Sequence, residues 1–281
     1  MSLISMRGSS TAVRRQDIRL PVAGRRAIIS LLTVIVLWEI SARSSYLFGF
    51  SIPYIGVLPA PSAVVAEWSG LVTDRGYWSS WYLSFSRVFA GFMCALILGA
   101  PLGLLFATNR MMRGVFFPVF EVLRPIPPIA WVPASIIFWP TQELSIIFVI
   151  FLGAFYPIVL NTFNGARQIE LPIVQSAISM GAGRWYLFRR IILPASLPNL
   201  VNGASIGMGV AWEVVVAAEM ISGGNGGATG SGLGLFLWNA YTAGNHEQIV
   251  VGMLSIGIAG YFSSALLRKF GGLLTPWLTR K

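Results

Sequence analysis

The chain has 281 residues, of which 55% are hydrophobic and only 11% are charged. Soluble domains carry about a quarter charged residues, so the composition excludes an ordinary soluble protein and indicates a polytopic membrane protein. The net charge of +10 would suggest a nucleic-acid partner in a soluble chain. Here the basic residues lie in short connectors between apolar segments, where they set topology, so we expect no nucleic-acid binding. The single cysteine, Cys94, excludes an internal disulfide and a cysteine metal cluster, and we expect no metal site.

In chain order, a basic tail comes first, followed by a transmembrane domain over residues 27–281. Arg25 and Arg26 before an apolar run also fit a signal peptide, but no small-residue cleavage site follows, so we expect a retained anchor. The tail, residues 1–26, is expected to fix orientation without chemistry of its own. The fold class is all-α, with spans of about 20 apolar residues. Six such spans are predicted at about 27–45, 82–107, 115–138, 144–163, 196–221 and 247–267.

The orientation of the chain in the membrane follows from the basic residues in its connectors. With the N-terminus in the cytoplasm, most of the 20 Lys and Arg residues fall on the cytoplasmic side, whereas Arg43 and Arg75 fall outside. Because basic connectors stay in the cytoplasm, both termini are predicted to be cytoplasmic.

The second span has a small-residue face at Gly99 and Gly103 that permits close helix contact. The third span is rich in proline, and each interior proline removes a helix hydrogen bond. Irregular backbone at membrane depth requires protein or a watery cavity around it, so this span is a candidate transport path. Glu121 and Arg124, three residues apart, are either a structural ion pair or a path element. The candidate path residues are Glu121, Arg124, Pro127, Trp131 and Glu213.

Two acidic residues lie in the fifth span. Glu219 is near the outer end and is expected to be hydrated. Glu213 is deeper and requires a donor, for which Arg87 and Arg124 are candidates.

Between the fourth and fifth spans lies a basic, amphipathic connector, about residues 166–195. Its pattern predicts a short helix, a break at Gly181, and a second short helix that begins near Arg184. Apolar and arginine side chains alternate at helical spacing, so we expect a helix-turn-helix on the cytoplasmic membrane surface. An inert interfacial helix is the plainer alternative.

In this connector Gln175, Ser176 and Ala177 are followed by Gly181 and then by Ile191, Leu193 and Pro194. The arrangement resembles the signature loop of bacterial ABC-importer permeases, in which Glu-Ala-Ala is followed by Gly and then by Ile-x-Leu-Pro. Gly181 and Ile191 keep the spacing of that loop, whereas Gln175 replaces the usual Glu and Ser176 the first Ala. The resemblance implies a coupling helix that docks on a cytoplasmic ATPase. The coupling residues so implied are Gln175, Ala177, Gly181, Ala182, Arg184, Trp185, Arg189, Ile191, Leu193 and Pro194.

A wider set of segments lies within residues 58–277: LPAPSAVV, SFSRVFAGF, GAPLGLLFATN, EVLRPIPPIAWVP, FYPIVLNTFNG, AWEVVVAAEMISG and GLGLFLW. These segments resemble the permeases of the nitrate, sulfonate and taurine importers. The resemblance implies a type I importer permease in the bacterial inner membrane. It further implies a homodimer of permeases, two ATPase subunits, an extracytoplasmic solute-binding protein, and a small anionic solute moved by alternating access.

Other classes fit less well. The chain contains no GxxxxGK[ST] phosphate-binding motif and no GxSxG motif, so neither a nucleotide site nor a serine hydrolase is predicted. The chain is expected to be a transport subunit and not an enzyme, with no cofactor. An ion-coupled secondary transporter that works without an ATPase remains the alternative, because broken helices and buried charges fit it as well.

Overall fold

The computed structural model describes residues 20–44, 58–222 and 232–279, and these residues form helices and connectors without a strand. The chain divides into two compact units, residues 1–62 and residues 63–281. In the first unit, helix α1 spans Leu20–Ala42, so it begins within the segment predicted as a tail. An ion pair of 2.6 Å joins Arg43 to Glu39, and both side chains bond to the Ser62 hydroxyl at 2.8 Å.

Short polar side chains start the helices of the second unit, as the sequence pattern favours. Asp74 accepts a bond from the Gly76 amide at the start of α4 (Arg75–Thr108). Asn109 accepts bonds from two amides at the start of α5 (Arg110–Leu123). Thr141 and Asn245 likewise cap α7 (Gln142–Arg167) and α12 (His246–Leu274). These caps separate long apolar stretches into distinct helices.

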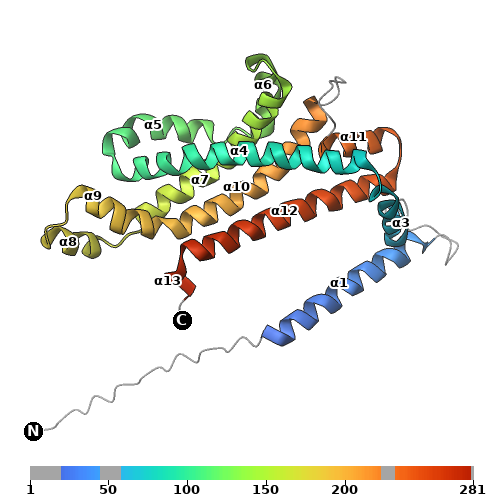
Figure 1. Ribbon diagram of the computed structural model, residues 1–281, viewed down its shortest axis with the longest axis horizontal. Helices are drawn as coiled ribbons and strands as arrows, with labels where there is room; N and C mark the ends of the chain where they lie inside the picture. The colour runs from blue at the N-terminus through green and yellow to red at the C-terminus, as the bar shows by residue number, and fades with distance from the viewer. Residues whose placement is uncertain (1–19, 45–57, 223–231, 280–281) are drawn as a thin grey trace, which may run out of the picture. The chain divides into compact units, whose positions relative to one another are not determined.

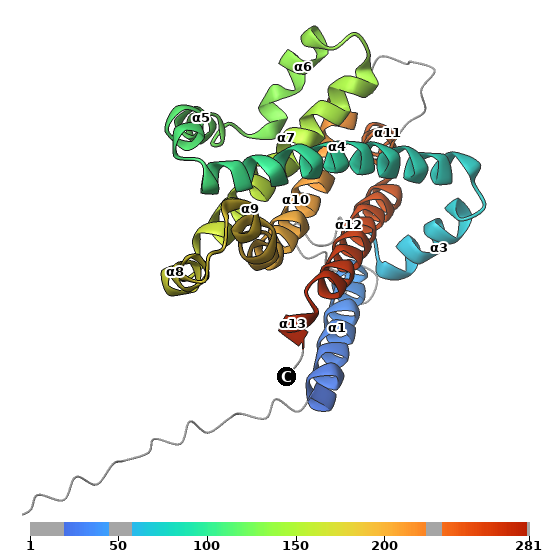
Figure 2. The same cartoon turned by 60° about the vertical axis from the view of Figure 1, so that its left-hand side comes forward.

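The core of the second unit lies among α4, α7 and α10 (Leu193–Ser222), which pack side by side (Figure 1, Figure 2). Their contact is close because glycines face it. A Cβ on Gly103 would lie 2.6 Å from the Val159 carbonyl oxygen, and one on Gly91 would lie 2.6 Å from Ile150. The predicted small-residue face of the second span is therefore confirmed at the contact of α4 with α7.

Four helical segments of the described residues are long and apolar enough to cross a membrane: Arg75–Thr108, Gln142–Arg167, Arg184–Ser222 and His246–Leu274. Four of the predicted spans, 82–107, 144–163, 196–221 and 247–267, lie inside them. The span at 27–45 coincides largely with α1 and stays a prediction, because α1 is not among these four segments.

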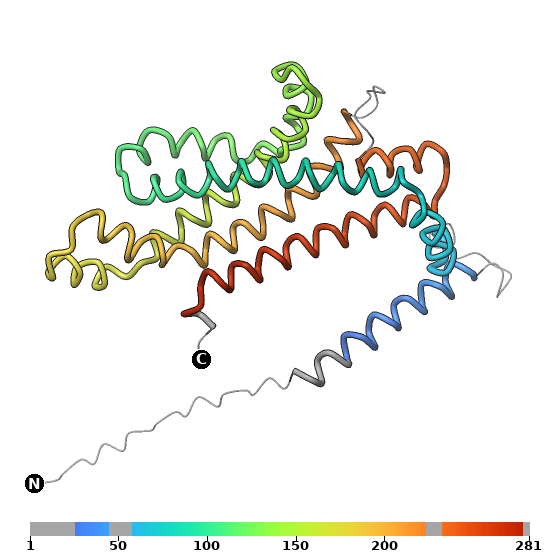
Figure 3. Tube along the Cα trace, in the orientation of Figure 1, coloured from blue at the N-terminus to red at the C-terminus, as the bar shows by residue number. Residues whose placement is uncertain are grey.

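The predicted span at 115–138 is not one helix. α5 ends at Leu123, a 3₁₀ turn η1 covers Pro128–Trp131, and α6 covers Val132–Phe138. The two halves are bent by 90° at the break, and together they would make a fifth span. Pro125, Pro127 and Pro128 explain the break, because none of them can donate a helix hydrogen bond. Figure 3 shows the chain reversing between α4 and α5 before it reaches this bend.

Three shorter helices complete the described fold outside the connector between α7 and α10. α3 (Pro61–Leu71) begins at a proline, and its part in the second unit packs against α12 through Val64 and Val251. α11 (Leu233–Thr242) packs against α10 and α12 and was not predicted from the sequence. α13 covers Pro276–Thr279.

Candidate functional site

The connector between α7 and α10 forms the helix-turn-helix that the sequence predicts. α8 covers Leu171–Ser179, α9 covers Arg184–Leu187, and a π-helical turn, η2, covers Phe188–Ile192 and runs directly into α10. We call Leu171–Ile192 the elbow. Figure 1 shows it at one end of the helices that it joins. A π-helical turn inside a helix is uncommon and is often found at functional sites.

The turn of the elbow is a Schellman motif centred on Gly181. The Gly181 amide donates to the Ile178 carbonyl at 2.9 Å, and the Ala182 amide donates to the Ala177 carbonyl at 3.0 Å. Gly181 has a φ of +86°, the left-handed conformation that closes this motif and that residues with a Cβ rarely adopt. A Cβ here would meet open space, so the glycine is required for its backbone angle alone.

The elbow exposes apolar side chains beside arginines. Within α8 only Ala177 is buried. Met180 is 82% exposed and Trp185 is 69% exposed, and the Trp185 ring stacks on Phe188 at a centroid distance of 5.8 Å. Arg184, Arg189 and Arg190 are exposed on the same element. An exposed aromatic residue flanked by arginines is typical of a protein-docking surface.

All ten residues predicted for coupling fall on the elbow and the first turn of α10. Gln175 is exposed on α8, and Ala182 is half-buried in the turn. The others are Ala177 and Gly181 in the Schellman motif, Arg184 and Trp185 in α9, Arg189 and Ile191 in η2, and Leu193 and Pro194 at the start of α10.

The five residues predicted for the path are not brought together. Arg124 Nη1 lies 3.6 Å from Glu121 Oε1, and both side chains are about half exposed. Pro127 precedes η1, and Trp131 packs against the main core with a buried indole N–H that has no partner among the described residues. Glu213 is exposed on α10. The structure therefore joins Glu121 to Arg124 and leaves Glu213 without either predicted donor.

A groove of about 640 Å³ runs beside Glu213 between α10 and α12. Trp212 and Val216 line it on the α10 side, and Tyr261 and Arg268 on the α12 side. Arg268 also borders a second hollow, with Asn202 and Ser205, nearer the start of α10. The two hollows follow the length of α10.

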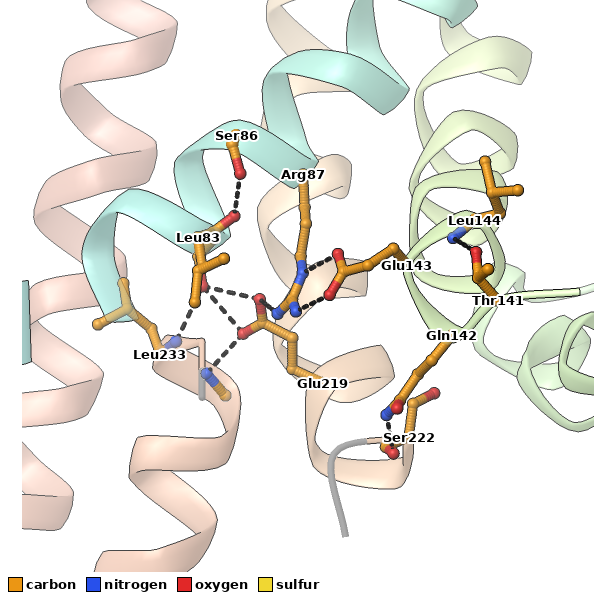
Figure 4. Close-up of polar contacts among 12 residues, drawn as sticks. Leu83, Ser86, Arg87, Thr141, Gln142, Glu143, Leu144, Glu219, Ser222 and Leu233 are labelled. Atoms are coloured by element: carbon orange, nitrogen blue, oxygen red, sulfur yellow. Dashed lines mark hydrogen bonds and ion pairs between the residues drawn. The ribbon is translucent and has the colours of Figure 1, made fainter. Parts of the chain in front are cut away.

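A buried ion network that the sequence did not predict joins α4, α7, α10 and α11 (Figure 4). Arg87, only 5% exposed, donates to Glu219 at 2.8 Å and to both carboxylate oxygens of Glu143 at 2.5 and 2.8 Å. Glu219 is 1% exposed. The expected hydration of Glu219 is wrong, and Arg87, one of the two candidate donors for Glu213, bonds to Glu143 and Glu219 instead. An arginine at membrane depth signals that an acidic partner faces it, but this signal does not say which one.

The same carboxylate anchors the first turn of α11. The Gly234 amide donates to Glu219 Oε2 at 2.8 Å, and Ser84 Oγ donates to Glu219 and accepts from the Leu233 amide at 2.8 Å. A negative charge at a helix N-terminus is stabilising. A Cβ on Gly232 or Gly234 would collide with Glu219, so glycine is required at both positions for this close approach.

Comparison with known proteins agrees with these features. Residues 95–280 match the family described as "Binding-protein-dependent transport system inner membrane component". The chain is 31% identical to the nitrate import permease protein NrtB of Synechocystis sp. (strain ATCC 27184 / PCC 6803 / Kazusa) over 260 residues, 89% of each chain. It is 29% identical to the taurine transport system permease protein TauC of Escherichia coli (strain K12) over 225 residues, 78% of this chain and 80% of TauC.

A solved structure has the same fold. A chain in the inward-facing MetNI methionine ABC transporter superposes with a TM-score of 0.54 at 23% identity, covering 72% of this chain and 95% of that one. The family match covers most of the described transmembrane helices and the whole elbow. The chain therefore belongs to the family of binding-protein-dependent transport inner membrane components and is an ABC importer permease of the nitrate, sulfonate and taurine type.

Proposed function

We propose that this permease forms the path through which a small solute bearing an oxyanion group enters the cell, driven by a separate ATPase. The names of the relatives support the solute class, because NrtB is a nitrate permease and TauC a taurine permease. Nitrate, sulfonates and taurine remain the candidate solutes. The elbow is the observation on which the ATP-driven mechanism rests.

The elbow is suited to transmit the movement of a docked ATPase to the core helices of the permease. Its exposed Trp185 and arginines form the docking surface, and the Schellman turn at Gly181 sets the angle between α8 and α9. Because η2 runs without a break into α10, displacement of the elbow moves a helix that packs against α4, α7 and α12. The ATPase closes on ATP, and the movement of α10 switches the side on which the path opens.

The sides of the membrane on which the remaining partners bind follow from the orientation of the chain. We place both termini, the elbow and the connector with Arg110 and Arg113 in the cytoplasm, because basic connectors remain there. α3, α11 and the Arg87 network then lie toward the outer face of the membrane, where a solute-binding protein releases its solute. Two copies of the permease enclose one path, and each copy docks one ATPase subunit.

The test is to purify the tagged chain in mild detergent and to measure the ATPase that accompanies it. Trp185→Ala should weaken binding of the ATPase about thirtyfold and reduce its recovery accordingly, since a tryptophan at the centre of an interface contributes on the order of 2 kcal/mol. Trp277→Ala is the matched control, because Trp277 is also an exposed tryptophan but lies in α13. Gly181→Asp should uncouple ATP hydrolysis from uptake without blocking membrane insertion.

Equal recovery of the ATPase with Trp185→Ala and with Trp277→Ala would contradict docking at the elbow. A transport-competent preparation that contains no ATPase would instead support the ion-coupled secondary transporter.

A further inference from the structure

One face of α10 remains open over the middle of the helix. Asn202, Ile206, Gly209 and Glu213 follow one another at intervals of four, three and four residues, so they form a single stripe. All four residues are exposed. Glu213 is the only acidic residue among those that line the groove between α10 and α12.

The two exposed faces of α12 differ in chemistry. The face toward the groove mixes polar and apolar residues, whereas the other face presents mainly large apolar side chains. The groove face holds Ile256, Gly257, Gly260, Tyr261, Ser264 and Arg268. The second face holds Leu254, Ile258, Phe262 and Leu266. The second face suits lipid or another apolar helix, whereas the groove face places the Ser264 hydroxyl and the Arg268 guanidinium in the same groove as Glu213.

Glu213 lies at membrane depth. α10 has 30 residues and is about 45 Å long. If it is centred in a hydrocarbon core of about 30 Å, it extends beyond the core by only about 7 Å at each end. Glu213 lies nine residues before Ser222, or about 14 Å from that end. Among the residues that the structure describes, it has neither a hydrogen bond nor an ion pair. A charged carboxylate facing lipid is strongly disfavoured, so Glu213 faces a watery space.

The sign of this charge restricts the solute. A carboxylate in a narrow watery path repels a simple anion such as nitrate and attracts a protonated amine. Resting on the proposed function, we propose that Glu213 is a specificity-determining residue of the path and that the solute carries a protonated amine beside its oxyanion group, as an aminosulfonate does. Arg268 supplies the opposite charge farther along the same groove.

The test measures the charge preference of the groove directly in the intact transporter. The reporter is Gly209→Cys, one helical turn from Glu213, combined with Cys94→Ser to remove the exposed native thiol. A side chain fits there, because a Cβ on Gly209 would meet nothing within 4 Å. The reporter is treated with methanethiosulfonate reagents that carry either a trimethylammonium or a sulfonate group, and the two rates of modification are compared.

The measured quantity is the rate of modification by the cationic reagent divided by the rate by the anionic reagent. We expect this ratio to be about ten times higher at the reporter than for a free thiol in solution. In water, a unit charge about 6 Å away raises the local concentration of a cation about threefold and lowers that of an anion about threefold. Glu213→Gln should abolish this preference. Leu266→Cys, on the apolar face of α12, should react slowly with both reagents and be unaffected by Glu213→Gln.

No reaction at the Gly209→Cys reporter would show that protein fills the groove, as a second copy packed against it would, and would overturn the proposal. A preference for the anionic reagent, or one that persists in Glu213→Gln, would also overturn it. Recovery of the ATPase is measured on the same samples. Absence of the ATPase would contradict the proposed function, whereas a missing reagent preference in samples that contain the ATPase would contradict only this inference.

Discussion

Replacement of Arg87 by methionine should destabilise the permease strongly. Methionine keeps much of the length of the arginine side chain but removes the charge. Glu219, which is 1% exposed, would keep the bonds from Ser84 and the Gly234 amide and would lose the only cation that pairs with it in the described part of the chain. Glu143 would lose both bonds from Arg87, but its side chain is 32% exposed and can reach water.

The magnitude follows from this difference in burial. Removal of one partner of a buried ion pair costs about 3–5 kcal/mol, because the other charge stays buried without compensation. Glu143→Gln should cost only about 1 kcal/mol, because partly exposed pairs contribute little. The double variant Arg87→Met, Glu219→Gln should lose less than the sum of its two single variants, since neither charge is then left alone.

The assay is thermal unfolding in detergent, followed by tryptophan fluorescence. For a domain of 150–250 residues, each kcal/mol lowers Tm by about 2–4 °C, so Arg87→Met should lower Tm by roughly 6–20 °C. A shift for Glu143→Gln as large as that for Arg87→Met would refute the assignment of the buried pair to Glu219. Strict additivity in the double variant would refute the coupling between Arg87 and Glu219.

Two further predictions concern α11 and the broken third span. Gly234→Ala should lower Tm by a few degrees, because the added methyl group would meet the Val216 carbonyl and the Glu219 side chain, and overpacking costs about 1–3 kcal/mol. Gly114→Ala, where a Cβ meets nothing within 4 Å, is the control, and equal shifts would contradict the packing argument. Arg124→Ala should slow uptake without lowering the amount of protein in the membrane, because its 3.6 Å pair with Glu121 is half exposed and stabilises by less than about 1 kcal/mol. Loss of the protein from the membrane would instead favour a structural ion pair.

Much of the fold could be predicted because the membrane imposes a strong pattern on the sequence. Four predicted spans lie inside long helices, and the glycine face at Gly103 meets α7. The break at Pro125–Pro128 was expected, but its 90° bend was not, since prolines remove hydrogen bonds without fixing the direction of the next segment. α11 was missed because it is short and follows a glycine-rich segment, and packing against α10 and α12 stabilises it.

The elbow could be predicted because its determinants are local. The position of Gly181 fixes a left-handed turn, and the flanking periodicity predicts the two short helices on either side of it. The Arg87 network could not be predicted, because its residues are separated by 56 and 132 positions along the chain. Several acidic residues compete for one arginine, and only the packing of α4 against α7 and α10 selects Glu143 and Glu219 over Glu213.

The most direct measurement is uptake and ATP hydrolysis together in the same vesicles, with the permease, its co-purified ATPase and its binding protein reconstituted and with radiolabelled taurine or nitrate as solute. We predict that uptake requires ATP on the side of the elbow. Trp185→Ala should reduce this uptake and the hydrolysis stimulated by the binding protein to the same extent. Uptake that continues without ATP and follows an ion gradient would contradict the ATP-driven mechanism.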